Sequence, residues 1–292
     1  MLRALDIFDP SSYPTRRDED WKYSDLSRVL RIVPAAEHAQ VLHERVDVPA
    51  GERVLRLERY DQSTPVTHQE VAIALGEGAF LTRVVILDEP EDAVSIRRST
   101  VTTAPGATFK QYVFSTGAKF QRFETHVDHA GHGASVELHG AYLLKDKVHF
   151  DLTTSVDHTQ PDGVTQQLIK GLVKDQATAV FQGRIKVERG ADGTDARMRH
   201  QALMLNDGAH VRAKPELEIY ADDVQCAHGN TIGAMDKAAL FFCQSRGMPE
   251  SVARQLLMQA FITPVADQIE DEELRATVLK FLEEKSGGFY AV

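Results

Sequence analysis

The sequence has few cysteines, no long apolar segment and no excess of basic residues. Two cysteines among 292 residues are too few for a disulfide framework, and a chain of this length buries enough surface to fold without one. No apolar run approaches the about 20 residues that span a bilayer, and the N-terminus lacks a secretory apolar region. With 33 basic and 43 acidic side chains, the formal net charge of -10 has the wrong sign for a general nucleic-acid-binding protein. We therefore expect a soluble cytoplasmic protein that binds neither nucleic acid nor membrane.

Motifs for nucleotide hydrolysis and for common hydrolases are also absent. The chain contains no G-x-x-x-x-G-K-[ST], H-E-x-x-H, G-x-S-x-G or G-x-G-x-x-G pattern. The first of these absences excludes a P-loop ATP site of the chain's own. If ATP hydrolysis drives its work, another polypeptide must supply the ATPase.

The middle of the chain, from Val46 to His228, has the pattern of many short strands. In residues 148–157, apolar and polar side chains alternate, as is typical of a half-buried strand. Similar runs, separated by turn-forming residues, occur at 53–60, 79–87, 108–114, 119–127, 134–144, 164–174, 178–188, 198–205 and 210–220. The pattern predicts an all-β body, which could be a sandwich, a barrel or a solenoid. Recurring Gly-Ala pairs before strands favour the solenoid: Gly106-Ala107, Gly117-Ala118, Gly133-Ala134 and Gly208-Ala209.

The two ends of the chain are expected to differ from this body, which we assign to residues 47–232. Residues 1–46 form an N-terminal arm, in which Trp21 packs against the body and a short amphipathic helix from Leu26 ends before Pro34.

Residues 233–292 are expected to form a C-terminal helical domain. Its first helix, at 238–243, is predicted to be largely buried, with Cys243 in the core. A second helix starts at Pro249 and a third near Asp271.

The candidate site lies where the last strand ends, at Cys226 and His228. One residue separates them, so in an extended strand both side chains point to the same side, with Cα atoms about 7 Å apart. Thiolate and imidazole both bind soft metals and iron–sulfur iron. Free cysteine also behaves as a small buried apolar residue, so the pair alone leaves a structural role open.

Other histidines are not expected to form a site. The run His126, His129 and His132 lies among glycines and strand-like residues, so we expect solvated turn histidines and no metal centre. His200 and His210 flank a predicted turn and receive no role.

Two long segments resemble a known family. KPELEIYADDVQCAHGNTIGAMD (214–236), continued by ALFFCQSRGMPESVARQLLMQAF (239–261), resembles the C-terminal core signature of the SufD proteins, which belong to the SufB/SufD family of iron–sulfur cluster assembly. PTRRDEDWKYSDLSRV (14–29) resembles the N-terminal signature of the same family. Together the two segments frame nearly the whole chain.

The resemblance implies a right-handed parallel β-helix with helical segments at its ends, acting as a non-catalytic scaffold subunit of a SufBCD complex. It implies pairing with SufB, or with itself when SufB is absent, and docking of the SufC ATPase on the C-terminal helices. His228 would face a SufB cysteine and share a transient iron–sulfur cluster with it, while Cys226 would be packed or an auxiliary ligand. No tightly bound cofactor is expected in the isolated chain.

Two alternatives remain. A self-sufficient SufB-like scaffold would assemble a cluster alone, although the chain lacks the cysteine-rich N-terminal features of SufB. A β-helix carbohydrate-active enzyme would need carboxylates, arginines or histidines on successive rungs of one groove, and the sequence shows no clear set.

Overall fold

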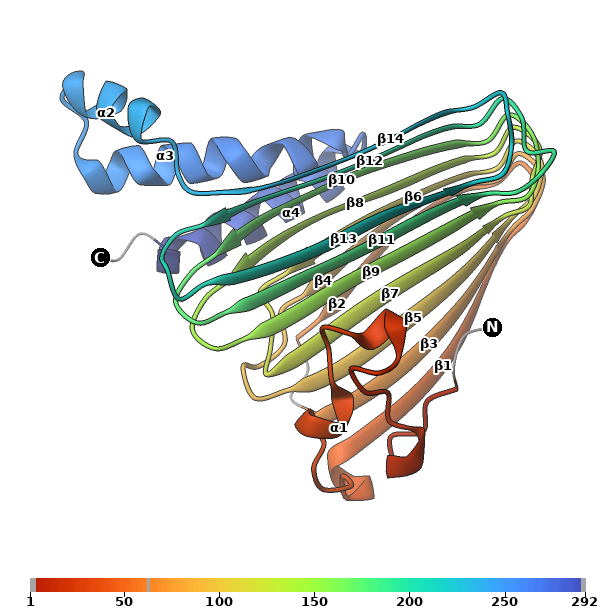
Figure 1. Ribbon diagram of the computed structural model, residues 1–292, viewed down its shortest axis with the longest axis horizontal. Coiled ribbons are helices and arrows are strands. Elements are labelled where there is room, and N and C mark those ends of the chain that lie inside the picture. The colour runs from red at the N-terminus through yellow and green to blue at the C-terminus, as the bar shows by residue number, and fades with distance from the viewer. Residues whose placement is uncertain (1–3, 62–63, 290–292) are drawn as a thin grey trace.

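A computed structural model describes residues 4–61 and 64–289 and shows a parallel β-helix flanked by an N-terminal segment and C-terminal helices (Figure 1). Within these ranges the strands form two seven-stranded sheets, and each rung of the helix gives one strand to each sheet. The first sheet, called sheet A here, contains β1 (Ala39–Val48), β3 (Val66–Leu75), β5 (Val94–Thr103), β7 (Phe120–His129), β9 (His149–His158), β11 (Thr178–Val187) and β13 (His210–Ile219). The second, sheet B, contains β2 (Arg53–Tyr60), β4 (Phe80–Leu87), β6 (Thr108–Ser115), β8 (Ser135–Leu144), β10 (Val164–Val173), β12 (Asp195–Met204) and β14 (Gln225–Gly233). The predicted parallel β-helix is confirmed.

One corner of the helix repeats the same backbone hydrogen bond from rung to rung. Gly106 and Gly133 adopt φ values of 64° and 63°, a left-handed conformation that glycine reaches at little cost. Their N–H groups donate to carbonyls of the corner in the next rung at 3.0 and 3.1 Å. Of the four Gly-Ala pairs named above, those at 106–107 and 133–134 lie at this corner, whereas those at 117–118 and 208–209 lie at the turns from sheet B to sheet A.

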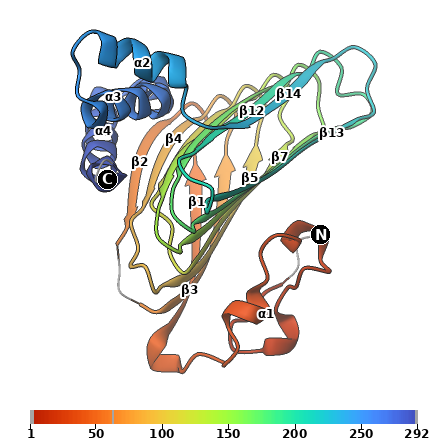
Figure 2. The same cartoon turned by 60° about the vertical axis from the view of Figure 1, so that its left-hand side comes forward.

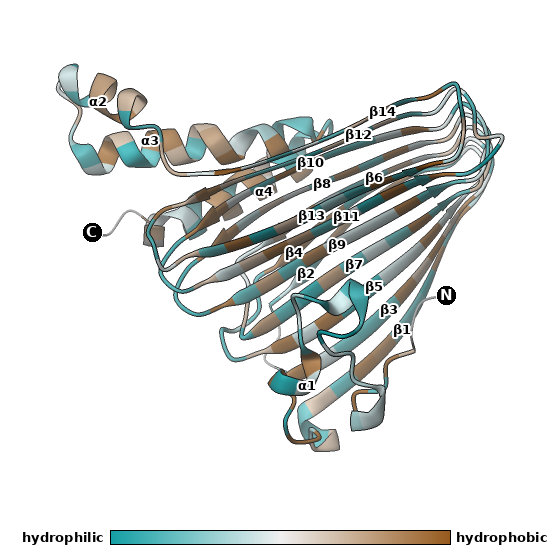
Figure 3. Cartoon of the chain, in the orientation of Figure 1, coloured by the Kyte–Doolittle hydropathy of each residue, from teal (hydrophilic) through white to brown (hydrophobic). Residues whose placement is uncertain are grey.

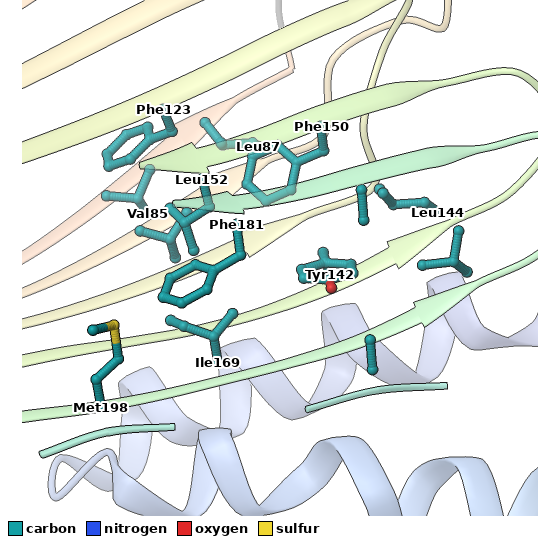
Figure 4. Close-up of a cluster of buried hydrophobic side chains, with 14 of the residues drawn as sticks. Val85, Leu87, Phe123, Tyr142, Leu144, Phe150, Leu152, Ile169, Phe181 and Met198 are labelled. Atoms are coloured by element: carbon teal, nitrogen blue, oxygen red, sulfur yellow. The ribbon is translucent and has the colours of Figure 1, made fainter. Parts of the chain in front are cut away.

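The interior changes character along the helix axis. Around the later rungs it is apolar, with aromatic side chains such as Phe123 and Phe181 in one buried cluster that also contains Met198 (Figure 4). In the first rungs a second apolar cluster, with Val71, Ile73 and Leu81, lies beside buried charges. The guanidinium of Arg83 is 1% exposed and donates to both carboxylate oxygens of Glu58 at 2.8 and 2.9 Å. The early core therefore depends on ion pairs that are buried and hydrogen-bonded.

The charged network also closes the first rung. Arg56, on β2, donates to both carboxylate oxygens of Glu44 on β1 at 2.7 Å and also binds Glu58. Tyr60 donates to the other oxygen of Glu58 at 2.7 Å. Charged side chains thus lie at the end of the stack where β1 and β2 have no preceding rung.

The N-terminal segment packs on the outer face of sheet A, and Figure 2 shows it on the opposite side of the β-helix from the C-terminal helices. Trp21 is 4% exposed, stacks on Phe120 with ring centroids 6.4 Å apart, and lies under the Arg122 guanidinium at 4.0 Å. The predicted anchoring role of Trp21 is confirmed. The segment's short helices are η1 (Pro10–Ser12), η2 (Glu19–Trp21), α1 (Leu26–Val29) and η3 (Ala36–His38), so its α-helix is only one turn long.

The C-terminal helices cover the outer face of sheet B. The elements are α2 (Lys237–Ser245), α3 (Glu250–Ile262), η4 (Thr263–Gln268), α4 (Glu272–Ser286) and η5 (Gly287–Phe289). The second half of α3, with η4 and α4, buries apolar side chains against that sheet. Pro249 directly precedes α3, and the Asp271 carboxylate accepts a hydrogen bond from Leu274 N–H at the start of α4, so both predicted helix starts are confirmed.

The prediction of a buried first helix is wrong. Helix α2 contains no buried residue, and Phe241 and Phe242 are 71% and 58% exposed. Cys243 is half-buried and does not lie in the core. The helix stands away from the β-helix with the first half of α3, and both carry hydrophobic residues (Figure 3). Its apolar composition therefore does not reflect burial in the core of this chain.

Residues 39–46, assigned to the arm from sequence, form most of β1, and β14 ends at Gly233. The predicted domain boundaries, between residues 46 and 47 and between residues 232 and 233, stay predictions. None of the helices in the described ranges combines the length and apolarity that a membrane crossing requires.

Candidate functional site

The last rung, formed by β13 and β14, leaves one edge of each sheet unpaired. Its inward-facing positions are in register with buried residues of β11 and β12, yet no later rung covers them. These residues, called the terminal surface here, are Val211, Ala213, Pro215, Leu217 and Ile219 of β13 and Cys226, His228, Asn230 and Ile232 of β14. Ile219 and Ile232 are 41% and 36% exposed. In contrast to the charged first rung, this end presents apolar side chains beside free backbone N–H and C=O groups.

His228 lies in the middle of β14, in register with Met198, which is 2% exposed. The histidine itself is exposed, because the strand beyond it is missing. Residues 4–61 and 64–289 offer no hydrogen bond or ion pair to the imidazole, so the ring is accessible to a ligand or a partner.

Cys226 is in register with Ala196, which is fully buried, and its thiol packs against the apolar core. Cys226 and His228 therefore do lie on one side of the strand. Burial raises the pKa of the Cys226 thiol, and the nearby Asp195 carboxylate acts in the same direction. The thiol is thus protonated at neutral pH, and His228 is the more accessible of the two ligand types.

This chain does not provide a complete metal centre in its described part. No group of three or more His, Cys, Asp or Glu side chains there is placed to hold a metal ion. An iron–sulfur cluster is usually held by four protein ligands. Any cluster bound at His228 would need further ligands from another molecule.

The prediction that the H-x-x-H-x-x-H run consists of solvated turn histidines is wrong for two of its members. His126 and His129 lie on β7, and His129 is fully buried and stacks on His158 at 4.3 Å. Burial, followed by the proximity of His129, lowers the pKa of His158 to about 3, so His158 is neutral at physiological pH. His132 alone lies in the turn.

Sequence reasoning also missed a contact next to the candidate site. His200, dismissed as a residue flanking a turn, is fully buried on β12, and its Nδ1 lies 2.8 Å from Asn230 Oδ1. Asn230 is two positions beyond His228 on the same face of β14. The sequence gives little warning of this, since an Asn in a strand has no periodic signature.

The outer face of sheet A has a groove that the sequence did not predict. It has a volume of about 370 Å³ and lies across successive rungs, with His126, Asp128, Asp157 and Arg184 in its lining. However, His126 pairs with the buried Glu124 at 3.1 Å, and Arg184 binds Asp157 at 3.5 Å. The charged groups therefore largely neutralise one another, and the groove does not single out an acid and a base for glycoside hydrolysis.

Comparisons with known proteins agree with the fold. A family model described as "SUF system FeS cluster assembly, SufBD core domain" matches residues 31–261. The chain is 29% identical over 251 residues to the iron-sulfur cluster assembly protein SufD of Escherichia coli strain K12, covering 84% of this chain and 59% of that protein. It is 30% identical over 197 residues to the SufBD family protein slr0076 of Synechocystis, covering 68% and 44%, and 29% identical over 210 residues to "Protein ABCI7, chloroplastic" of Arabidopsis thaliana, covering 72% and 44%. The chain thus spans between 44% and 59% of the length of these relatives.

Proposed function

Because the chain belongs to the SufBD family of iron–sulfur cluster assembly proteins, we propose that it is a SufD-like scaffold subunit of a SufBCD complex. In this proposal it pairs through the terminal surface with SufB, or with a second copy of itself when SufB is absent. The SufC ATPase docks on the C-terminal helices. The chain has no catalytic activity of its own, and the cytoplasm stays the predicted compartment.

The observation that carries the proposal is the unfinished last rung around the accessible His228. An edge strand with exposed apolar neighbours is poorly stable in water, and natural proteins usually protect such an edge with charges or cover it. The first rung is protected by Arg56, Glu44 and Glu58, whereas the terminal surface has no equivalent ion pairs among the described residues. A partner chain that continues the two sheets would satisfy the backbone groups and bury Ile219 and Ile232.

In the proposed complex the cluster is cargo. His228 supplies one imidazole nitrogen at the interface between the two subunits, called the seam here. A SufB cysteine and other ligands complete the coordination. Imidazole ligands raise the potential of a cluster relative to thiolate ligands. Because this chain contributes few ligands, separation of the two subunits would release the cluster. Movement of docked SufC subunits, driven by ATP, is the step proposed to open the seam.

Helix α2 supports the proposed SufC docking. Phe241 and Phe242 of α2 are exposed, as are Val252 and Leu256 of α3, both 47% exposed, and the two helices contact each other. Exposed apolar side chains gathered on one pair of helices are typical of an interaction site in soluble proteins.

The test is anaerobic cluster assembly by the purified complex carrying His228→Ala. We expect roughly tenfold or greater loss of retained iron and sulfide, because even residues that only support metal ligands cost ten- to a hundredfold in affinity when replaced. Thr231→Ala is the matched control, since Thr231 is exposed on the opposite face of the same strand. Undiminished assembly by His228→Ala would remove the ligand role.

The alternative of a self-sufficient scaffold is less well supported. It requires several cluster ligands on one chain, and no such group occurs in the described residues. Co-purification distinguishes the two proposals: a SufD-like subunit is recovered with SufB and SufC at fixed stoichiometry, whereas a self-sufficient scaffold holds iron and sulfide alone.

A further inference from the structure

A chain of three hydrogen-bonded side chains runs from the terminal surface into the core. It starts at Asn230, which is exposed on β14, continues to His200 on β12, and ends at Tyr142 on β8. Asn230 Oδ1 lies 2.8 Å from His200 Nδ1, and His200 Nε2 lies 2.8 Å from the Tyr142 hydroxyl. His200 and Tyr142 are 0% and 1% exposed.

The atoms at each end fix the direction of these hydrogen bonds. A carboxamide oxygen can only accept, so His200 Nδ1 must carry the proton and donate to Asn230. His200 Nε2 is then the acceptor, and the Tyr142 hydroxyl donates to it. Burial lowers the pKa of His200 to about 4 and raises that of Tyr142, so both stay in these neutral forms at physiological pH. The carboxamide oxygen of Asn230 is therefore held toward the core, and its NH₂ group takes no part in this chain of hydrogen bonds.

The chain is built into the packing. Phe181 stacks on the His200 ring at 4.9 Å with an interplanar angle of 8°. Tyr142 reaches His200 across the intervening strand β10 at Gly171, where an added Cβ would lie 1.9 Å from the tyrosine ring. Figure 4 shows the Tyr142 ring and its hydroxyl within the packed aromatic cluster. A side chain at position 171 would displace the ring, so this glycine is what allows the contact.

The free end of the chain lies at the candidate site. Asn230 follows His228 by two residues, so both side chains share one face of β14, with Cα atoms about 7 Å apart. Within the part of the chain that the structure describes, no group accepts a hydrogen bond from the Asn230 NH₂. An oriented donor without an acceptor therefore lies beside an accessible imidazole.

We propose that Asn230 donates a hydrogen bond to a sulfur atom of the cluster, or of the partner thiolate, held beside His228, and that His200 and Tyr142 position it. The inference rests on the proposed function. Iron–sulfur clusters and thiolates are anionic, and hydrogen bonds to their sulfur atoms raise the reduction potential because they stabilise the added negative charge. A carboxamide N–H group supplies such a hydrogen bond without placing a further charge beside the cluster.

The experiment measures the reduction potential of the cluster on the anaerobically reconstituted complex, loaded with ferrous iron and sulfide. Asn230→Ala removes the donor, and we expect about a fivefold fall in the ratio of reduced to oxidised cluster at a fixed potential, the effect of one ordinary hydrogen bond. At 59 mV per tenfold for one electron, this is a shift of about 40 mV to lower potential. Asn230→Asp keeps the oxygen that accepts from His200 but replaces the donor by an anionic oxygen, so a larger shift in the same direction is expected.

Thr231→Ala serves as the control and should leave the potential unchanged. Thermal unfolding of each variant separates a folding defect from an electronic effect, since a merely structural Asn230 would change stability without moving the potential. An unchanged potential in both Asn230 variants overturns the inference. His228→Ala, measured in parallel, reports on the proposed function. If His228→Ala loses the cluster but the Asn230 variants do not shift its potential, only the role of Asn230 is refuted. If His228→Ala retains the cluster unchanged, both the proposed function of His228 and the role of Asn230 are refuted.

Discussion

Replacing Ile219 and Ile232 by alanine should weaken pairing through the terminal surface. The two side chains leave 41% and 36% of their surface exposed, which together is about three quarters of one isoleucine. Full burial of an isoleucine contributes about 1.5–3 kcal/mol, so the pair should contribute about 1–2 kcal/mol to association. This corresponds to a roughly five- to thirtyfold increase in the Kd for SufB. In a symmetric homodimer each residue occurs twice, and the effect on the free energy doubles.

The assay is analytical ultracentrifugation of the double variant, alone and with a SufB partner, over a range of concentrations. Ile32→Ala is the matched control, because Ile32 is 85% exposed on the N-terminal arm, outside the terminal surface. Circular dichroism should show unchanged strand content in both proteins. If the double variant associates as tightly as the control, the terminal surface is not the seam and the argument from the unfinished rung fails.

Two further predictions concern the interior. Burial alone would raise the pKa of Glu58, but Arg83 and the other partners of the carboxylate lower this pKa from 4.5 to about 2. The carboxylate therefore stabilises the fold by about 3 kcal/mol above pH 4.5. This contribution is lost as the pH falls toward 2. In urea unfolding, the stability gap between wild type and Glu58→Gln should narrow by about 2 kcal/mol between pH 6 and pH 3; a gap independent of pH would contradict the assignment. Gly171→Ala should destabilise the protein by about 1–3 kcal/mol through overpacking against Tyr142, whereas Gly229→Ala, with open space around it, should change the urea midpoint little. Equal midpoints for the two variants would contradict the packing argument.

Most strands of the body could be predicted from the sequence pattern, and the parallel β-helix from the family resemblance, but three early strands could not be predicted. The segments that form β1, β3 and β5 were not predicted as strands. Their inward positions include polar side chains such as Gln69, Arg97 and Ser99, which the interior accommodates through hydrogen bonds. Alternation of apolar and polar residues is then lost, although the strand is fully formed. A pattern based on hydropathy fails where the core is polar.

The candidate site was only partly predictable for a related reason. The spacing of Cys226 and His228 on one strand correctly predicts that they share a face, because that depends on backbone geometry alone. The exposure of His228 depends on the strand being the last of its sheet, which the sequence does not show. Helix α2 was misassigned in the same way: an apolar segment indicates burial, but not whether it is buried by its own chain or by another.

The unlike ends of the β-helix limit how far assembly can proceed. A stack of parallel rungs with two adhesive ends would add subunits head to tail and grow into a fibre. Here charged groups close one end, so when two chains meet at their terminal surfaces both outer ends carry ion pairs that resist further strand addition. In the proposed dimer, polymerisation would therefore stop at two chains, and a variant that neutralises Arg56 and Glu44 is expected to form filaments more readily.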